Sequence, residues 1–219
     1  CNTAAAIALR RLQQDWLPTA YPERRVLGVF VPMVEAVTNV PWRIEGPVPA
    51  VLPAARLIGV FATRRTVESG AYAREIARRA PQVRVVQQAC PGLVRHIEDD
   101  APARAIAPLV EGFVAGLLAQ AEGELPDSVI LGCTHYPLVA DAFAAALPPR
   151  VRLFAQPELV AASLADYLAR HPEFDPTPEV DGTLRFYTTG DAARASALGS
   201  RFFGGEIRFA ALPAGDVSS

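Results

Sequence analysis

The sequence predicts a mostly parallel α/β sheet with helices on both faces. Three observations lead to this fold class. Apolar runs of about five residues recur along the chain and alternate with longer amphipathic segments of helical periodicity. Several of these runs are apolar throughout, which is typical of strands buried on both faces of a parallel sheet. Hydrophobic residues make up 51% of the 219, so the chain can bury a sizeable core.

The first part of the chain alternates helix and strand. Residues 3–15 are rich in Ala, Leu and Arg and predict a helix. Residues 25–31 (RVLGVFV) predict the first strand, and residues 32–38 a short helix. Residues 40–53 hold four prolines and one glycine, which predict a loop or a crossing between domains. The next strand, LIGVFA, covers residues 57–62.

The rest of the chain continues this alternation. A helix is predicted at 66–79. It is expected to end there because Pro81 lacks the N–H that a further turn would need. Further strands are predicted at residues 83–87, 128–132, 151–154, 184–188 and 207–210. Further helices are predicted at 93–100, 103–121, 137–147, 158–170 and 192–203, with a Pro/Asp turn region at 172–178. Ligands bind at the carboxyl ends of strands in such sheets, so the loops after residues 62, 132 and 188 are the places to look for chemistry.

Composition excludes several classes of function. The net charge of -2 argues against nucleic acid as a partner. All 21 basic residues are Arg, so no pyridoxal Schiff base, Lys nucleophile or P-loop Lys can form. Three widely spaced cysteines make no disulfide framework and suit a reducing cytoplasm. Arg and Pro interrupt the longest apolar runs, so no membrane span is expected, and no metal-ligand spacing is present.

The segment GCTHYPL places a thiol directly after a predicted strand. Cys133 follows Gly132, and Pro137 suits the first turn of a helix. Amide dipoles at a helix N-terminus stabilise a thiolate, and His135 can pair with the thiol or with a substrate carboxylate. The alternative is a buried structural cysteine in a turn between strand and helix.

The chain start has a similar layout, because Cys1 is followed by Asn2, Thr3 and a helix. Two thiols facing each other across a ligand can invert a Cα centre: one removes the proton and the other returns a proton on the opposite face. The absence of lysine excludes the pyridoxal route to the same reaction. The alternative is that Cys1 is merely where the sequence begins.

Two short motifs in this chain, CNTA at residues 1–4 and GCTHYPL at residues 132–138, resemble the signature motifs of the aspartate/glutamate racemase family. GVFVP, IGVFATRRTVESGAY, QACPGLVRHIE and FYTTGD agree in order and spacing, so the resemblance covers essentially the whole chain. It implies a cofactor-independent racemase with two α/β domains and the active site between them. The implied activity interconverts L- and D-glutamate and supplies D-glutamate for peptidoglycan synthesis, and therefore for the cell wall and cell shape.

The resemblance also implies roles for individual residues. Cys1 and Cys133 match the two catalytic thiols, and His135 and Glu98 match positions that assist proton transfer. The residues implied to bind substrate are Asn2, Thr3, Thr63, Thr66, Thr134 and His135. For Thr63 and Thr66 the alternative role is helix capping, and for Glu98 it is a solvated helix face beside Asp99 and Asp100.

The resemblance divides the chain into residues 1–32 and 155–219 for the first domain and 33–154 for the second. It implies a leading segment ahead of CNTA, with a D-S-G motif whose Asp supports the first thiol and a P-Y-G motif. A chain that starts at Cys1 is therefore expected to have an incomplete first domain and to be inactive. Ala155-Gln156 stands where family members often have Asp-Ser or Asp-Pro.

Different functions stay open at this point. An aspartate or related amino-acid racemase fits the same motifs, and a homodimer is one candidate assembly. A non-catalytic ligand-binding fragment is a further possibility. If Cys1 were a processed terminus, the chain could be an N-terminal-nucleophile amidohydrolase, but those folds have antiparallel sheets and this sequence predicts a parallel one.

Overall fold

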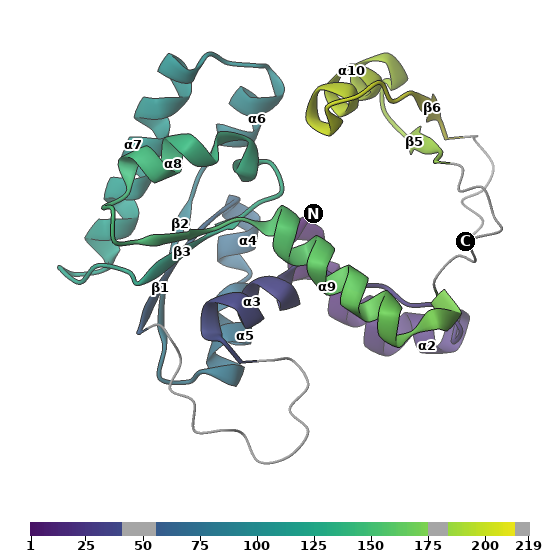
Figure 1. Cartoon of the computed structure of the whole chain (residues 1–219), viewed down its shortest axis with the longest axis horizontal. Helices are drawn as coiled ribbons and strands as arrows, with labels where there is room; N and C mark the ends of the chain where they lie inside the picture. Colours follow the sequence, from purple (N-terminus) through teal and green to yellow (C-terminus); the bar gives the residue numbers. More distant parts are fainter. Residues whose placement is uncertain (41–55, 175–183, 213–219) are drawn as a thin grey trace. The chain divides into compact units, whose positions relative to one another are not determined.

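The computed structural model describes residues 1–40, 56–174 and 184–212 (Figure 1). The chain separates into two compact units, Cys1–Tyr167 and Leu168–Ser219. The expected proline-rich loop lies outside the described residues from position 41 onward, and so does the expected turn region from position 175.

The larger unit is built on a four-stranded parallel sheet with strand order β2-β1-β3-β4. The strands are β1 (Leu57–Ala62), β2 (Arg84–Ala89), β3 (Ser128–Gly132) and β4 (Arg152–Phe154). All six residues of β1 and all five of β3 are buried, as expected for the two central strands. Both were predicted at these bounds, and the mostly parallel α/β fold class is confirmed.

Strand register brings two loops to the same edge of this sheet. Ala62, the last residue of β1, pairs with Gly132, the last residue of β3. Thr63 and Cys133 therefore leave adjacent strand ends side by side. This is the edge at which a parallel α/β sheet offers space for a ligand.

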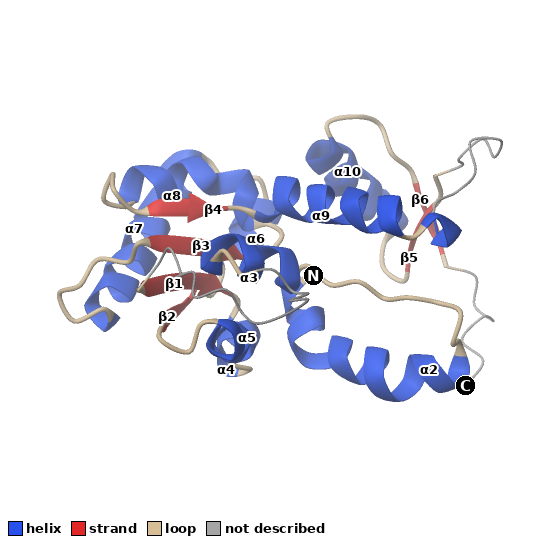
Figure 2. Ribbon diagram, turned by 60° about the horizontal axis from the view of Figure 1, so that its bottom comes forward, coloured by secondary structure: helices blue, strands red, loops and turns tan. Residues whose placement is uncertain are grey.

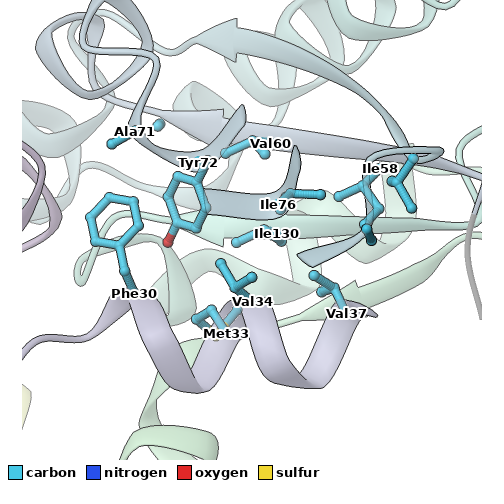
Figure 3. Close-up of a cluster of buried hydrophobic side chains, with 13 residues drawn as sticks. Phe30, Met33, Val34, Val37, Ile58, Val60, Ala71, Tyr72, Ile76 and Ile130 are labelled. Atoms are coloured by element: carbon cyan, nitrogen blue, oxygen red, sulfur yellow. The ribbon is translucent and has the colours of Figure 1, made fainter. Parts of the chain in front are cut away.

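Helices cover both faces of the sheet (Figures 1 and 2). On one face lie α3 (Phe30–Thr38) and α5 (Ala71–Arg79), with α4 (Arg64–Glu68) before α5. Their apolar side chains pack on alternate residues of the central strands, Ile58, Val60 and Ile130 (Figure 3). Burying each such side chain contributes roughly 1.5–3 kcal/mol.

The opposite face is covered by α7 (Ala103–Gln120) and α8 (Ala140–Ala146), with α6 (Leu93–Glu98) before α7 and the 3₁₀ turn η3 (Tyr136–Val139) before α8. Leu117 of α7 packs over Gly59, where an added Cβ would lie 2.9 Å from Leu117 Cδ2. The Phe61 and Phe143 rings lie 4.9 Å apart and join β1 to α8. The odd-numbered residues of β1 therefore face this second helical layer.

Among the described helices, α7 alone is long and apolar enough to cross a membrane by length and composition. No membrane span was expected from the apolar runs of the sequence. One such helix is weak evidence, because core helices of globular proteins satisfy the same criterion. The buried residues of α7, Ile106, Val110, Val114 and Leu117, recur at helical spacing, and Leu117 packs on the sheet.

The chain start is helical from Asn2 to Ala20, in segments α1 (Asn2–Ala4), η1 (Ala5–Leu9), η2 (Leu12–Trp16) and α2 (Leu17–Ala20). The strand predicted at 25–31 is wrong: this stretch has no strand partner among the described residues, and α3 begins at Phe30. An apolar run becomes a strand only where a neighbouring strand offers backbone partners. Here the Val26 carbonyl accepts a bond from the Gln13 side chain instead, at 2.6 Å.

The helix predicted at 66–79 is divided in two. Gly70 adopts the left-handed conformation (φ 61°), which ends the run begun by α4 and lets α5 start in a new direction. The last helix of the larger unit, α9 (Gln156–Arg170), begins two residues after β4 and extends into the smaller unit.

The smaller unit contains a parallel pair, β5 (Phe186–Thr188) and β6 (Phe209–Ala211), joined by α10 (Ala192–Phe203). A single turn, η4 (Pro172–Phe174), precedes them. Asp191 caps α10 by accepting a bond from the Arg194 N–H at 2.8 Å. The division into racemase domains at 1–32, 33–154 and 155–219 stays a prediction.

Candidate active site

The turn after β3 holds a thiol and an imidazole, and the carboxylate of Glu98, the last residue of α6, contacts that imidazole. Cys133 Sγ lies 4.0 Å from His135 Nδ1, and His135 Nε2 lies 3.0 Å from Glu98 Oε1. The Cys133 side chain is buried, whereas His135 and Glu98 are 27% and 33% exposed. The imidazole can therefore pass a proton between the buried thiol and a carboxylate in contact with solvent.

Burial raises the pKa of Cys133 above that of an ordinary cysteine. The backbone N–H groups of His135 and Tyr136 lower this pKa, but burial outweighs them. The negative charge of Glu98 also raises it. The amides thus stabilise the thiolate as the sequence predicted, yet Cys133 carries its proton at neutral pH.

Hydrogen bonds between Asn2 and Tyr72 and between Thr3 and Thr63 hold the residues next to Cys1 at this end of the sheet. Cys1 is exposed, and so is Thr134, the residue between Cys133 and His135. Cys90, the third cysteine, is buried, and burial raises its pKa to about 12. Cys90 is therefore a structural thiol that stays protonated.

Three hydroxyl groups meet at the end of β1. Thr3 Oγ1 lies 2.9 Å from Thr63 Oγ1 and 3.1 Å from Thr66 Oγ1, and the last two lie 3.0 Å apart. Thr63 also caps α4 by accepting a bond from the Thr66 N–H. The capping role and the contact with the chain start therefore coexist, and hydroxyls at a helix start can donate to an anion.

A second polar cluster surrounds Asn2, and two of its members were not predicted. Tyr72 Oη donates to Asn2 Oδ1 at 2.8 Å, and Gln156 exchanges two bonds with the Asn2 amide, at 2.8 and 2.9 Å. All three side chains are at most 3% exposed. Gln156 directly follows a predicted strand and stands where family members often have Ser or Pro, and these were the signals available in the sequence.

No group of three or more His, Cys, Asp or Glu side chains in the described ranges is placed to hold a metal ion. The groups that the geometry offers are thiol, imidazole, carboxylate, hydroxyl and amide. These groups can transfer protons and bind a small polar molecule.

Comparison with known proteins gives this site its context. The model of the Asp/Glu/Hydantoin racemase family matches residues 29–163. A glutamate racemase from Phenylobacterium zucineum is 45% identical over 214 residues, which cover 95% of this chain and 75% of that protein. The chain belongs to the Asp/Glu/Hydantoin racemase family.

Further members of this racemase family are similar to the chain over most of its length. A glutamate racemase from Roseobacter denitrificans is 47% identical over 211 residues, covering 96% of this chain and 74% of the relative. The crystal structure of a glutamate racemase isoform from Bacillus anthracis matches with a TM-score of 0.77 at 26% identity, covering 98% of this chain and 72% of that one. The family resemblance therefore extends over almost the whole chain.

Seen as part of a racemase, the predicted residues form two groups. Cys133, His135 and Glu98 are in one line, and Thr3, Thr63 and Thr66 form the hydroxyl triangle. Asn2 lies in the amide cluster between Cys1 and Thr3 in sequence. The catalytic and binding roles assigned to these residues stay predictions.

Proposed function

We propose that this protein interconverts L- and D-glutamate without a cofactor, using Cys1 and Cys133 as acid and base. The observation that carries the proposal is the thiol–imidazole–carboxylate line at Cys133, in a chain whose named relatives are glutamate racemases. The product D-glutamate would serve peptidoglycan synthesis in the cytoplasm.

The proposed reaction moves one proton off Cα and another onto it. One cysteine, as thiolate, removes the α-proton and becomes a thiol, and the electron pair stays on the planar carbanion. The other cysteine, as thiol, donates its proton to the opposite face and becomes a thiolate. His135 and Glu98 would then return Cys133 to its starting protonation state by exchange with solvent.

The hydroxyl triangle supports binding of a substrate carboxylate. Thr3, Thr63 and Thr66 bring three O–H groups together at the start of α4, where amide dipoles also favour an anion. Removing a proton from Cα places negative charge next to this carboxylate. Hydroxyl donors held in advance would stabilise that charge as it develops.

An N-terminal-nucleophile amidohydrolase is contradicted, because it required an antiparallel sheet and every pair of strands described here is parallel. Assays with glutamate and with aspartate distinguish a glutamate racemase from an aspartate or related racemase. A protein that only binds its ligand would turn over neither amino acid.

The test compares two cysteine variants of the protein, expressed with any residues that its gene encodes ahead of Cys1. Circular dichroism follows the decay of the signal from L-glutamate and from D-glutamate. Cys133→Ala should reduce racemisation to below a few per cent in both directions, because each direction needs both faces. Cys90→Ala, which removes the third thiol, should keep activity within about twofold. Substantial turnover by Cys133→Ala would overturn the two-thiol proposal.

A further inference from the structure

Two buried residues outside the predicted site bind the same side chain in it. Asn2 Oδ1 accepts one bond from Tyr72 Oη and one from Gln156 Nε2, and Asn2 Nδ2 donates to Gln156 Oε1. Gln156 Nε2 also lies 3.4 Å from Tyr72 Oη, so the three groups form a closed ring of bonds. Three of the four hydrogen-bonding positions of the Asn2 amide are thereby occupied.

The three residues come from separate elements. Asn2 begins the first helix, Tyr72 is the second residue of α5, and Gln156 is the first residue of α9, at the end of β4. Because these side chains are buried, no water can replace a lost hydrogen bond. Breaking this ring of hydrogen bonds would therefore leave a buried polar group without a partner. The second N–H of Asn2 has no acceptor in the described part of the chain.

Tyr72 also touches the second thiol motif. A Cβ added at Gly132 would lie 3.0 Å from Tyr72 Cε2, so the aromatic ring of Tyr72 packs directly on Gly132, the residue before Cys133. The same ring lies 4.2 Å from that of Phe30, which fixes it from the side of α3. Figure 3 shows Tyr72 between α3 and the sheet. One side chain thus bonds to the CNTA motif through its hydroxyl and packs on the GCTHYPL motif through its ring.

We propose that Tyr72 and Gln156 are positioning residues that hold the Asn2 amide in one orientation and keep the two thiol motifs in register. They act through Asn2, which lies between the predicted thiol Cys1 and the hydroxyl of Thr3. This inference rests on the proposed function, because the register matters only if both motifs act on one substrate.

The proposal predicts different losses for different substitutions. Tyr72→Phe keeps the aromatic ring on Gly132 and removes the hydroxyl that bonds to Asn2 and Gln156, so kcat/KM should fall about tenfold. Gln156→Met removes both bonds of the amide pair, and a displacement of Asn2 by about 1 Å can cost roughly a hundredfold. The loss should lie mainly in kcat. The fold-loss of activity in the double variant should be smaller than the product of the two single fold-losses, because both substitutions act through the Asn2 amide.

Gln156→Glu gives a signature that a merely structural role would not. A protonated carboxylic acid can replace the amide, donating to Asn2 Oδ1 and accepting from Nδ2, whereas a carboxylate cannot donate. Activity relative to wild type should therefore be near normal at low pH. It should fall as pH rises through the carboxyl pKa, which burial sets above the ordinary value. A relative activity that does not change with pH would contradict the proposal.

A matched control separates positioning from stability. Thr38 is fully buried and its hydroxyl donates to the Val34 carbonyl at 2.6 Å, within α3. Thr38→Val should lower thermal stability and leave kcat and KM within about twofold. If Tyr72→Phe and Gln156→Met also keep wild-type kcat, the inference is overturned.

Hydrogen exchange of the Asn2 side-chain amide, followed by NMR, distinguishes this inference from the proposed function. The amide should exchange slowly in the wild type and faster in Tyr72→Phe and Gln156→Met. If the wild type does not racemise glutamate but the Asn2 amide is protected in this way, the proposed function is wrong, while Tyr72 and Gln156 still hold the Asn2 amide in one orientation. Fast exchange in the wild type would overturn the inference whatever the activity.

Discussion

At the scale of single residues, Cys133 is governed by two opposing effects. Burial makes its proton harder to remove, while the backbone amides of His135 and Tyr136 make it easier. Burial is the larger effect, so the resting group is a thiol. A protonated Cys133 suits the role of acid, and the His135–Glu98 pair gives it a route for proton exchange.

Glu98→Gln should let Cys133 react with an alkylating agent at lower pH, and it should slow racemisation. The negative charge of Glu98 raises the pKa of Cys133, so removing it should move the pH profile of Cys133 alkylation to lower pH, by less than about one unit. Racemisation should nevertheless fall about tenfold, because the amide cannot exchange a proton with His135 as the carboxylate can. Asp99→Asn, on the neighbouring exposed residue, serves as the control and should change neither. An alkylation profile that stays in place or moves upward would count against this view of the site.

Much of this site could be predicted from local sequence, because the thiol, the hydroxyl and the imidazole all follow predicted strands. Tyr72 and Gln156 could not be predicted in this way. They bond to Asn2 across 70 and 154 residues, and nothing near them in sequence marks them as its partners. Glu98 was predicted through the family resemblance, whereas its neighbours Asp99 and Asp100 favoured a solvated surface; the fold brings its carboxylate to His135.

At the scale of secondary structure, the central strands are joined at their amino ends by one carboxylate. Asp127 Oδ2 accepts bonds from the backbone N–H of Arg56 at 2.7 Å and of Leu57 at 3.0 Å. Partial burial opposes ionisation of Asp127, but these donors and the Arg56 charge outweigh it and hold its pKa below the usual value. The carboxylate thus ties the residue before β3 to the start of β1.

Asp127→Asn should destabilise the fold by about 1 kcal/mol at pH 7, since the group is exposed and partly screened. Its folded pKa is depressed, so its contribution is complete above the unfolded pKa of about 3.9 and is lost as pH falls through the folded value. Urea unfolding at pH 7 and pH 3 measures this, with Glu111→Gln on the exposed face of α7 as control. A difference between wild type and variant that does not shrink at pH 3 would refute the assignment.

Element prediction succeeded where hydrophobic pattern alone decides the outcome. The buried strands β1 and β3 and the helix α10 were predicted at their observed bounds. The strand expected at 25–31 failed because pairing depends on a partner elsewhere in the chain. The single helix expected at 66–79 failed at Gly70, whose left-handed backbone the helical periodicity did not reveal.

At the scale of the whole molecule, the larger unit contains every residue assigned to the site. Parallel register places Thr63 and Cys133 on one edge of the sheet, and the helix at the chain start brings Asn2 and Thr3 to the same elements. The fold thus collects groups that are more than 130 residues apart in sequence. A reaction on two faces of one carbon needs such convergence from separate segments.

In the proposed mechanism two different thiols act on opposite faces of Cα, and deuterium incorporation distinguishes this from a mechanism with a single base. L-Glutamate is incubated in D₂O with the protein, and the two enantiomers are separated and analysed by mass spectrometry during the first turnovers. We predict that newly formed D-glutamate carries deuterium at Cα, because the donating thiol has exchanged with solvent, while the remaining L-glutamate keeps its proton. D-Glutamate that retains the substrate's own α-proton would contradict the account, because a single group would then have removed and returned it.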